Sequence, residues 1–406
     1  MFNKRGLWAF LMTILILFIS DPLPAAATPE LVGEAAALID SRNGQFLFEK
    51  NSAQRMYPAS TTKILTAIIA LERGRLDDLV CIPGDACNIE GSATGLQEGE
   101  RISLEDLLYA LMLNSGNDTA VAIAHHIGGS VEEFVRMMNT MAETIGANNS
   151  HFTNPNGLPD PDHYSTAHDM ALIAHYAMQN PEFRKIVATP AITIQREVPE
   201  AQTYLDNHNK LLWNYNGAIG IKTGYTNDAR QCLVSAAARQ GRELIAVVLK
   251  SEGNYIWSDT ITLLDYGFNE FKNVSLIEAG KYVADTRVRS GVSDTVPAQT
   301  GFSLTYNLPV DNRQEVRQKI FLDNSIVAPV KAGAKIGELA FYAGDSELGR
   351  VDLVAQNGIE RKVTSRWWLY LIPALGLMIL VLIVRYHNLC RRKRWMRYKR
   401  QKKQLF

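Results

Sequence analysis

One run of apolar residues sets the strongest constraint on how this chain can fold. Nearly every residue from Ile64 to Leu71 is apolar, with Pro58 before the run and Gly74 after it. Proline and glycine in these places mark the two ends of a helix. A helix that is apolar on almost all sides belongs in a domain interior. The chain must therefore supply other elements that cover this helix.

Two polar residues, Ser60 and Lys63, stand at the start of this helix. A spacing of three residues is close to one helical turn, so both side chains lie on one face. A buried lysine tends toward its neutral form and can then accept the proton of a neighbouring serine. The pair indicates a nucleophilic serine with a lysine base. The alternative is a serine that only caps the helix.

The first 27 residues predict a secretory signal peptide. Lys4 and Arg5 precede an apolar run from Leu7 to Ile19, and Ala25-Ala26-Ala27 follow as a cleavage site. We expect cleavage after about Ala27. An uncleaved membrane anchor is the alternative.

A second apolar segment, Trp367 to Val384, lies near the other end and has 18 residues without a charge. This length is near the lower limit for a helix that spans a membrane. Residues 385–406 carry ten lysines and arginines and no acidic residue. Because lysines and arginines next to a membrane span stay on the cytoplasmic side, we expect a single span with a cytoplasmic tail and an extracytoplasmic body. A helix lying in the membrane plane would need a polar face, which this segment lacks.

The remaining body is acidic. The whole chain is neutral, so the ten excess cations of the tail and one at the N-terminus leave residues 28–384 with eleven excess negative charges. This balance argues against nucleic acid as a partner. The length of 406 residues allows two domains with a sizeable core.

Cysteines and histidines give weaker signals. The chain has four cysteines, too few for a disulfide scaffold, and none with the spacing of a zinc site. We expect a local disulfide between Cys81 and Cys87, with two free thiols as the alternative. Five histidines lack ligand-type partners at suitable spacing, so we expect solvated or capping side chains and no metal; they are His125, His126, His163, His168 and His175.

The order of elements predicts an α+β fold, in which helices are packed on an antiparallel sheet. A hairpin over 34–50 carries an Asn-Gly turn. Helical periodicity or capping signals follow at 104–113, 118–127, 131–145 and 166–178. Three strands at 218–226, 232–238 and 243–249 form a meander before a closing helix at 260–268. Beyond residue 272, short alternating strands predict a small all-β domain over 273–362.

Three short motifs stand in order along the predicted body: Ser60-x-x-Lys63, Ser115-x-Asn117 and Lys222-Thr223-Gly224. Together they resemble the active-site signature of penicillin-binding proteins and serine β-lactamases. The runs 154–158 and 163–167 extend the resemblance to the low-molecular-weight D-alanyl-D-alanine carboxypeptidases, over about residues 30–360. The resemblance implies a penicillin-binding domain at 28–272, followed by the β-domain and the membrane anchor.

The resemblance also implies a serine-type carboxypeptidase that cleaves peptidoglycan stem peptides ending in D-Ala-D-Ala, with β-lactam antibiotics as covalent inhibitors. No metal or organic cofactor is implied. The backbone N–H groups of the nucleophile and of the residue after the third motif would form the oxyanion hole. The implied catalytic residues are Ser60, Lys63 and Ser115, and the implied substrate-binding residues are Asn117, Lys222, Thr223, Gly224 and Tyr225.

The sequence departs from the family pattern at two places. Tyr225 stands where many relatives have histidine, and residues 253–258 contain no arginine near the closing helix. Recognition of a substrate carboxylate would then depend more on Lys222 and Thr223. A serine β-lactamase, a D,D-endopeptidase and a non-catalytic wall-binding protein remain as alternatives.

Overall fold

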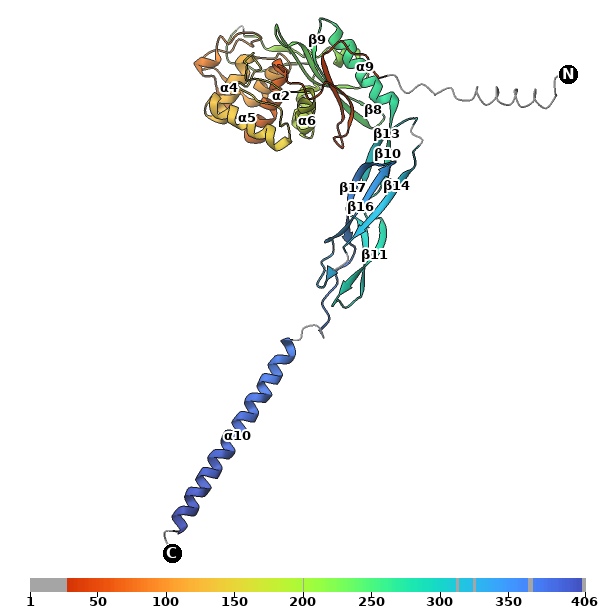
Figure 1. Cartoon of the computed structure of the whole chain (residues 1–406). Coiled ribbons are helices and arrows are strands. Elements are labelled where there is room, and N and C mark those ends of the chain that lie inside the picture. The colour runs from red at the N-terminus through yellow and green to blue at the C-terminus, as the bar shows by residue number, and fades with distance from the viewer. Residues whose placement is uncertain (1–27, 200, 312–313, 324–325, 364–367, 404–406) are drawn as a thin grey trace, which may run out of the picture. The chain divides into compact units, whose positions relative to one another are not determined.

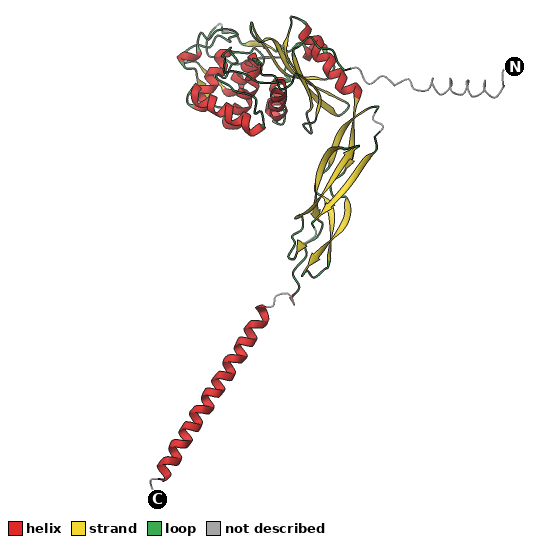
Figure 2. Cartoon of the chain, in the orientation of Figure 1, coloured by secondary structure: helices red, strands yellow, loops and turns green. Residues whose placement is uncertain are grey.

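The computed structural model describes residues 28–403, except 200, 312–313, 324–325 and 364–367. The signal-peptide prediction lies outside these residues. The described chain forms two compact units, and residues 307–311 belong to the first unit although they follow strands of the second. Figure 2 shows a first unit of mixed helices and strands, and only strands and loops between residues 271 and 363.

The first unit combines a five-stranded sheet with helices (Figure 1). Its helices are η1 (Ala59–Thr62), α2 (Lys63–Arg73), η2 (Gly84–Ala86), α3 (Leu104–Met112), α4 (Asn117–Gly128), α5 (Val131–Ile145), α6 (Ala167–Ala177), α7 (Pro181–Val187), α8 (Leu211–Asn214) and α9 (Tyr255–Glu270). Its strands are β1 (Ala35–Asp40), β2 (Phe46–Lys50), β3 (Leu79–Cys81), β4 (Arg101–Ser103), β5 (Ala191–Thr193), β6 (Tyr204–Asp206), β7 (Ala218–Thr226), β8 (Arg230–Arg239) and β9 (Arg242–Ser251).

The main sheet has the order β2-β1-β9-β8-β7, with every neighbouring pair antiparallel. The N-terminal hairpin therefore joins the later meander through β1 and β9. Side chains of β1 alternate between two cores: Ala37 and Ile39 pack with helices α2 to α7, while Leu38 packs with α9. Both faces of the sheet are thus covered, which explains why all six residues of β1 are buried.

The helix from Lys63 to Arg73 lies in the larger of these cores, as its apolar composition requires. Its residues from Lys63 to Ala70 are all buried. Neighbouring helices begin and end at the expected signals: the Ser130 hydroxyl accepts the Glu133 N–H at the start of α5, and the Thr166 hydroxyl accepts the Asp169 N–H at the start of α6. These caps satisfy backbone donors that a helix N-terminus leaves unpaired.

The strands that follow α9 form an all-β region, as the sequence predicts, and the first residues of β10 and the last of β13 belong to the first compact unit. These strands are β10 (Phe271–Ile277), β11 (Tyr282–Arg289), β12 (Thr295–Thr300), β13 (Leu304–Pro309), β14 (Val316–Leu322), β15 (Ile326–Val327), β16 (Lys335–Ala343) and β17 (Ser346–Ala355). Six of them form one sheet in the order β14-β16-β17-β12-β11-β15. Its core is small and apolar, with Val296, Leu339 and Val351 fully buried.

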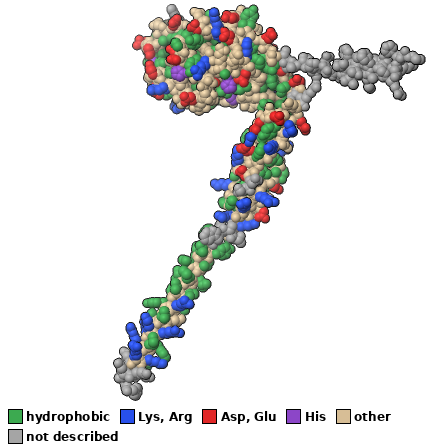
Figure 3. Space-filling model, viewed as in Figure 1, with side chains coloured by type: hydrophobic (Ala, Val, Ile, Leu, Met, Phe, Trp, Pro, Cys, Tyr) green, Lys and Arg blue, Asp and Glu red, His purple; other side chains and the backbone are tan. Residues whose placement is uncertain are grey.

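The last helix, α10 (Trp368–Lys403), is 36 residues long and contains Pro373. Among the described residues it is the one helix long and apolar enough to cross a membrane. Figure 3 shows green apolar side chains along its first part and blue lysines and arginines toward its end. At about 1.5 Å per residue the helix is about 54 Å long, more than the roughly 30 Å of a hydrocarbon core.

The disulfide prediction for Cys81 and Cys87 is wrong: all four cysteines are free thiols. Cys81 belongs to β3, where its neighbour Val80 points into the core and its own side chain faces solvent. The Cys87 side chain instead packs against the core of the first unit. The two sulfurs are close in sequence but are directed into different surroundings.

Candidate active site

The nucleophile candidate Ser60 lies in a short 3₁₀ turn, and the α-helix proper begins three residues later at Lys63. The turn is fixed by Thr61, whose N–H and hydroxyl both donate to the Pro58 carbonyl. Ala59 adopts a positive φ of 47°, which is unusual for a residue with a side chain. Such strain of order 1–3 kcal/mol is typical of functional sites. The turn holds Ser60 half-exposed above a buried helix.

The amine of Lys63 has three neighbours within hydrogen-bond distance. Its Nζ lies 2.6 Å from Asn117 Oδ1, 2.6 Å from the Asn156 carbonyl and 3.0 Å from Ser60 Oγ. The first two atoms can only accept, so they take the two N–H groups of a neutral amine. The nitrogen lone pair then faces the Ser60 hydroxyl. This is the geometry of a base beside its nucleophile.

The surroundings of Lys63 favour that neutral form. Burial is the main cause that lowers the pKa of Lys63 well below its ordinary value, and the charge of Lys222 lowers it further. The carboxylate of Asp118 opposes both effects. Because the charged form is disfavoured, the amine is available as a proton acceptor.

The second motif lies at the junction of α3 and α4. Ser115 is buried with a positive φ of 65°, and Asn117 is the first residue of α4. The amide of Asn117 is held at both ends, since its Nδ2 donates to the Glu90 carbonyl while its Oδ1 accepts from Lys63. Within the described residues the Ser115 hydroxyl has no hydrogen-bond partner. The structure thus joins Asn117 to Lys63 directly, but not Ser115.

The third motif lies on the edge strand β7, paired with β8. Gly224 faces the nucleophile so closely that a Cβ there would lie 3.0 Å from the Ser60 N–H nitrogen. A glycine in a strand often marks such a close backbone approach. Lys222 is buried, and burial lowers the pKa of Lys222 to about 7. The Tyr225 side chain is 54% exposed, so its place here depends on its backbone rather than on its ring.

A cavity of about 540 Å³ opens over the nucleophile. Three of the predicted site residues line it: Ser60, Asn117 and Tyr225. Lys63 and Lys222 are buried and are not among the residues that line the cavity. The cavity continues along the end of β7 to Asp228. The arrangement suits an extended chain that lies along β7 with one carbonyl at Ser60.

Sequence analysis assigned no role in the site to Asp118, which holds a loop beside the cavity. Its carboxylate accepts the backbone N–H groups of Thr94, Gly95 and Leu96. Arg196 donates to the carbonyls of Thr94 and Gly95 in the same loop. It also forms an ion pair with Glu100, and neither side chain of this pair is exposed to solvent. These contacts fix the loop before the second motif, which lines the cavity at 90–92. No local sequence pattern pairs these distant residues.

The expectation that the histidines are solvated or capping is wrong for His163. This side chain is buried, and its Nε2 lies 2.9 Å from the hydroxyl of Thr62 in the nucleophile turn. Its Nδ1 lies 3.1 Å from the backbone nitrogen of Thr153. Burial lowers the pKa of His163 to about 4, so the ring is neutral at neutral pH. The neutral ring of His163 therefore stabilises the nucleophile turn through its hydrogen bond with Thr62.

Comparisons with known families match both units. Residues 24–253 match the family described as D-alanyl-D-alanine carboxypeptidase, and residues 271–361 match the C-terminal domain of penicillin-binding protein 5. The first match covers more than half of the chain. The second match covers the all-β unit.

Individual relatives agree with these families. The chain is 32% identical to D-alanyl-D-alanine carboxypeptidase DacF of Bacillus subtilis, over 82% of this chain and 88% of that protein. It is 30% identical to DacD of Escherichia coli, over 84% of this chain and 91% of that protein. The crystal structure of penicillin-binding protein 5 from Haemophilus influenzae matches with a TM-score of 0.74, 30% identity and coverage of 83% and 100%. The chain therefore belongs to the D-alanyl-D-alanine carboxypeptidase family.

Proposed function

We propose that this carboxypeptidase removes the terminal D-alanine from peptidoglycan stem pentapeptides through an acyl-enzyme on Ser60. The observation that carries the proposal is the hydrogen-bond pattern of Lys63. Two acceptors, Asn117 Oδ1 and the Asn156 carbonyl, occupy its N–H groups and leave the lone pair for Ser60. A buried amine in this arrangement serves as general base.

In the acylation step, Ser60 Oγ forms a bond to the carbonyl carbon between the two D-alanines, and its proton passes to Lys63. The oxyanion is bound by the backbone N–H groups of Ser60 and Tyr225, which lie on adjacent elements because β7 approaches η1 at Gly224. The C–N bond then breaks, and Ser115 relays a proton to the leaving amine. Water hydrolyses the ester and restores the serine.

Recognition of the terminal carboxylate falls to Lys222 and Thr223. Because burial lowers the pKa of Lys222 to about 7, this lysine is charged below that pH and loses its charge above it. We expect kcat/KM for a peptide ending in a free carboxylate to fall as pH rises through about 7, relative to the matched terminal amide. To bind the substrate amide, the Asn117 side chain would have to give up its hydrogen bond to Lys63 or its hydrogen bond to the Glu90 carbonyl.

The proposed location is the outer face of the cell membrane. The apolar part of α10 would span the bilayer, and the basic residues 385–406 would stay on the cytoplasmic side. We propose a mature chain that starts at about residue 28, with the catalytic domain at 28–272 and the β-domain at 273–362 as a spacer. Residues 367–384 form the span in this arrangement.

One experiment tests the proposed function. The native chain should release D-alanine from a pentapeptide ending in D-Ala-D-Ala, and it should gain the mass of one benzylpenicillin. Ser60→Ala should do neither while keeping its fold, as judged by circular dichroism. A normal penicillin adduct on the variant would overturn the role of Ser60. Rapid turnover of a chromogenic cephalosporin, without release of D-alanine, would instead show a β-lactamase.

A further inference from the structure

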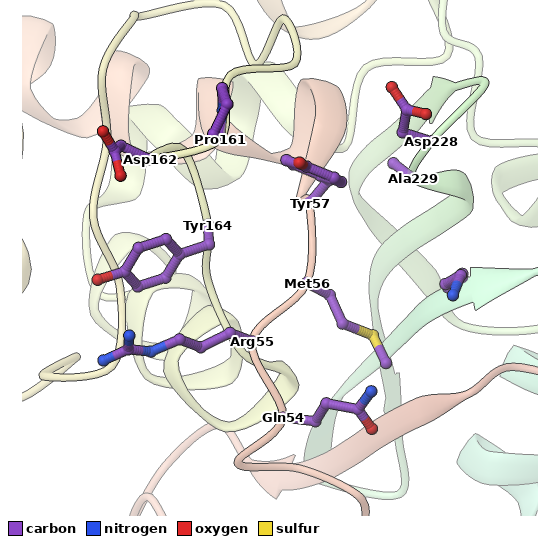
Figure 4. A pocket seen from close by; sticks show the side chains of 10 residues that line it. Gln54, Arg55, Met56, Tyr57, Pro161, Asp162, Tyr164, Asp228 and Ala229 are labelled. Atoms are coloured by element: carbon purple, nitrogen blue, oxygen red, sulfur yellow. The ribbon is translucent and has the colours of Figure 1, made fainter.

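A second cavity of about 510 Å³ lies beside the first one (Figure 4). The segment 54–57, the loop at 161–164 and the turn at 228–229 form its walls. Figure 4 shows Arg55 and Tyr164 on one side, Asp228 on the opposite side, and Met56 between them. Three segments that are distant in sequence thus build one cavity.

The cavity carries both signs of charge. The Arg55 guanidinium lies 4.4 Å from the ring centre of Tyr164, a cation–π contact. Among the described residues, neither Arg55 nor the carboxylates of Asp162 and Asp228 have an ion-pair partner. Lys250, the remaining charged residue of the lining, is already paired with Glu34. One cation and two carboxylates are therefore available to a ligand.

The position of this cavity ties it to the nucleophile. Asp228 lines both cavities, just beyond the end of β7. Tyr57 lines the second cavity and precedes Ser60 by three residues, a separation of at most about 11 Å for an extended chain. A long side chain on the residue next to the bound D-Ala-D-Ala end can cover that distance.

We infer that the cavity binds the side chain of the residue that immediately precedes D-Ala-D-Ala, and that it selects a side chain ending in both an amine and a carboxylate. This inference rests on the proposed function. Arg55 would bind the carboxylate, and Asp162 and Asp228 would bind the amine. A neutral or singly charged side chain would leave one set of partners unused.

The test compares four peptides that share the D-Ala-D-Ala end. The preceding residue carries an amino-carboxylate side chain, an amine alone, a carboxylate alone, or a neutral chain of the same length. For each exposed charge pair we expect about a two- to five-fold effect on kcat/KM, because solvent weakens such pairs. The first peptide should be the best substrate and the neutral peptide the poorest.

Two sets of variants separate the charges. Arg55→Gln should make the amino-carboxylate peptide no better than the amine peptide. The double variant Asp162→Asn with Asp228→Asn should make it no better than the carboxylate peptide. Arg73→Gln is the matched control, since Arg73 is an exposed arginine at the far end of α2 and has no ion pair among the described residues. It should keep the native ratios between peptides.

A binding measurement keeps this inference separate from the proposed function. The affinities of the four peptides for the Ser60→Ala protein measure binding in the second cavity without turnover. Failure of the native chain to release D-alanine from any peptide would refute the proposed function, while the binding order would still report the cavity. The inference would be overturned if the four peptides differed by less than two-fold in both kcat/KM and affinity. It would also be overturned if Arg55→Gln and the double variant kept the native ratios of kcat/KM between the peptides.

Discussion

Protonation of His163 should weaken the support of the nucleophile turn. Its Nδ1 accepts the Thr153 N–H, so the proton of the neutral ring is on Nε2, which donates to the Thr62 hydroxyl. A second proton would have to sit on Nδ1, facing a backbone donor. The charged ring would then lose its bond to Thr153 inside a buried site.

The size of the effect follows from the pKa difference between the folded and unfolded chain. Burial lowers the pKa of His163 to about 4, while an unfolded histidine has about 6.5. The unfolded chain therefore binds more protons in this range, and stability falls as pH falls below about 6.5. The loss is about 2 kcal/mol at pH 5 and approaches about 3 kcal/mol below pH 4.

The assay compares the native chain with His163→Phe by urea unfolding at about pH 7.5 and pH 5. At the higher pH the variant should be less stable by about 1–3 kcal/mol, because the Thr153 N–H loses its acceptor. At pH 5 the difference should shrink by about 2 kcal/mol, since phenylalanine does not titrate. His125→Phe, at an exposed ion pair with Asp85, is the control. An unchanged difference between native and His163→Phe at both pH values would refute the reasoning.

Four further outcomes are expected. Lys63→Ala should slow acylation by penicillin by about 10²-fold or more, as for other lost general bases, measured by mass spectrometry over time. Thr223→Val should narrow the rate gap between peptides ending in a free carboxylate and in an amide, because it deletes one donor to the carboxylate. Arg196→Leu should destabilise the fold by about 3–5 kcal/mol in thermal unfolding, and the double variant with Glu100→Leu should recover most of that loss. External protease on intact cells should release an active fragment of about residues 28–360; digestion of the basic tail instead would reverse the proposed topology.

Local signals account for the parts of the fold that sequence predicted well. The helix predicted at 131–145 has those bounds in the structure, because Ser130 caps its start and Gly146, with a positive φ, ends it. The helix with the capping box at Thr166 and Asp169 also forms as expected. The predicted strands at 232–238 and 243–249 form because each is a largely apolar run between turns, whereas the strand at 218–226 mixes apolar and polar residues.

Contacts between segments that are distant in sequence could not be predicted from the sequence alone. Nothing local in the run 35–40 shows that this strand pairs with β9, more than two hundred residues away. The burial of His163 arises because its loop meets the nucleophile turn, 101 residues distant in sequence. Short helices such as α7 and α8 were missed because four to seven residues give too few periods to recognise. The motifs identified the chemistry because their residue types and order are unusual together.

Two glycines packed against the nucleophile turn restrict the substitutions by which this enzyme could become resistant to antibiotics. A side chain at Gly157 would overlap the carbonyl of Ala59, and one at Gly224 would crowd the backbone of Ser60. Both neighbours are main-chain atoms of a fixed turn, so neither can move aside as a flexible side chain could. We therefore expect no inherited resistance to begin at these two positions, because a side chain that excludes the drug there would also displace the serine. We expect selected substitutions to gather at the cavity rim, where Tyr225 and Leu158 can change size without disturbing that turn.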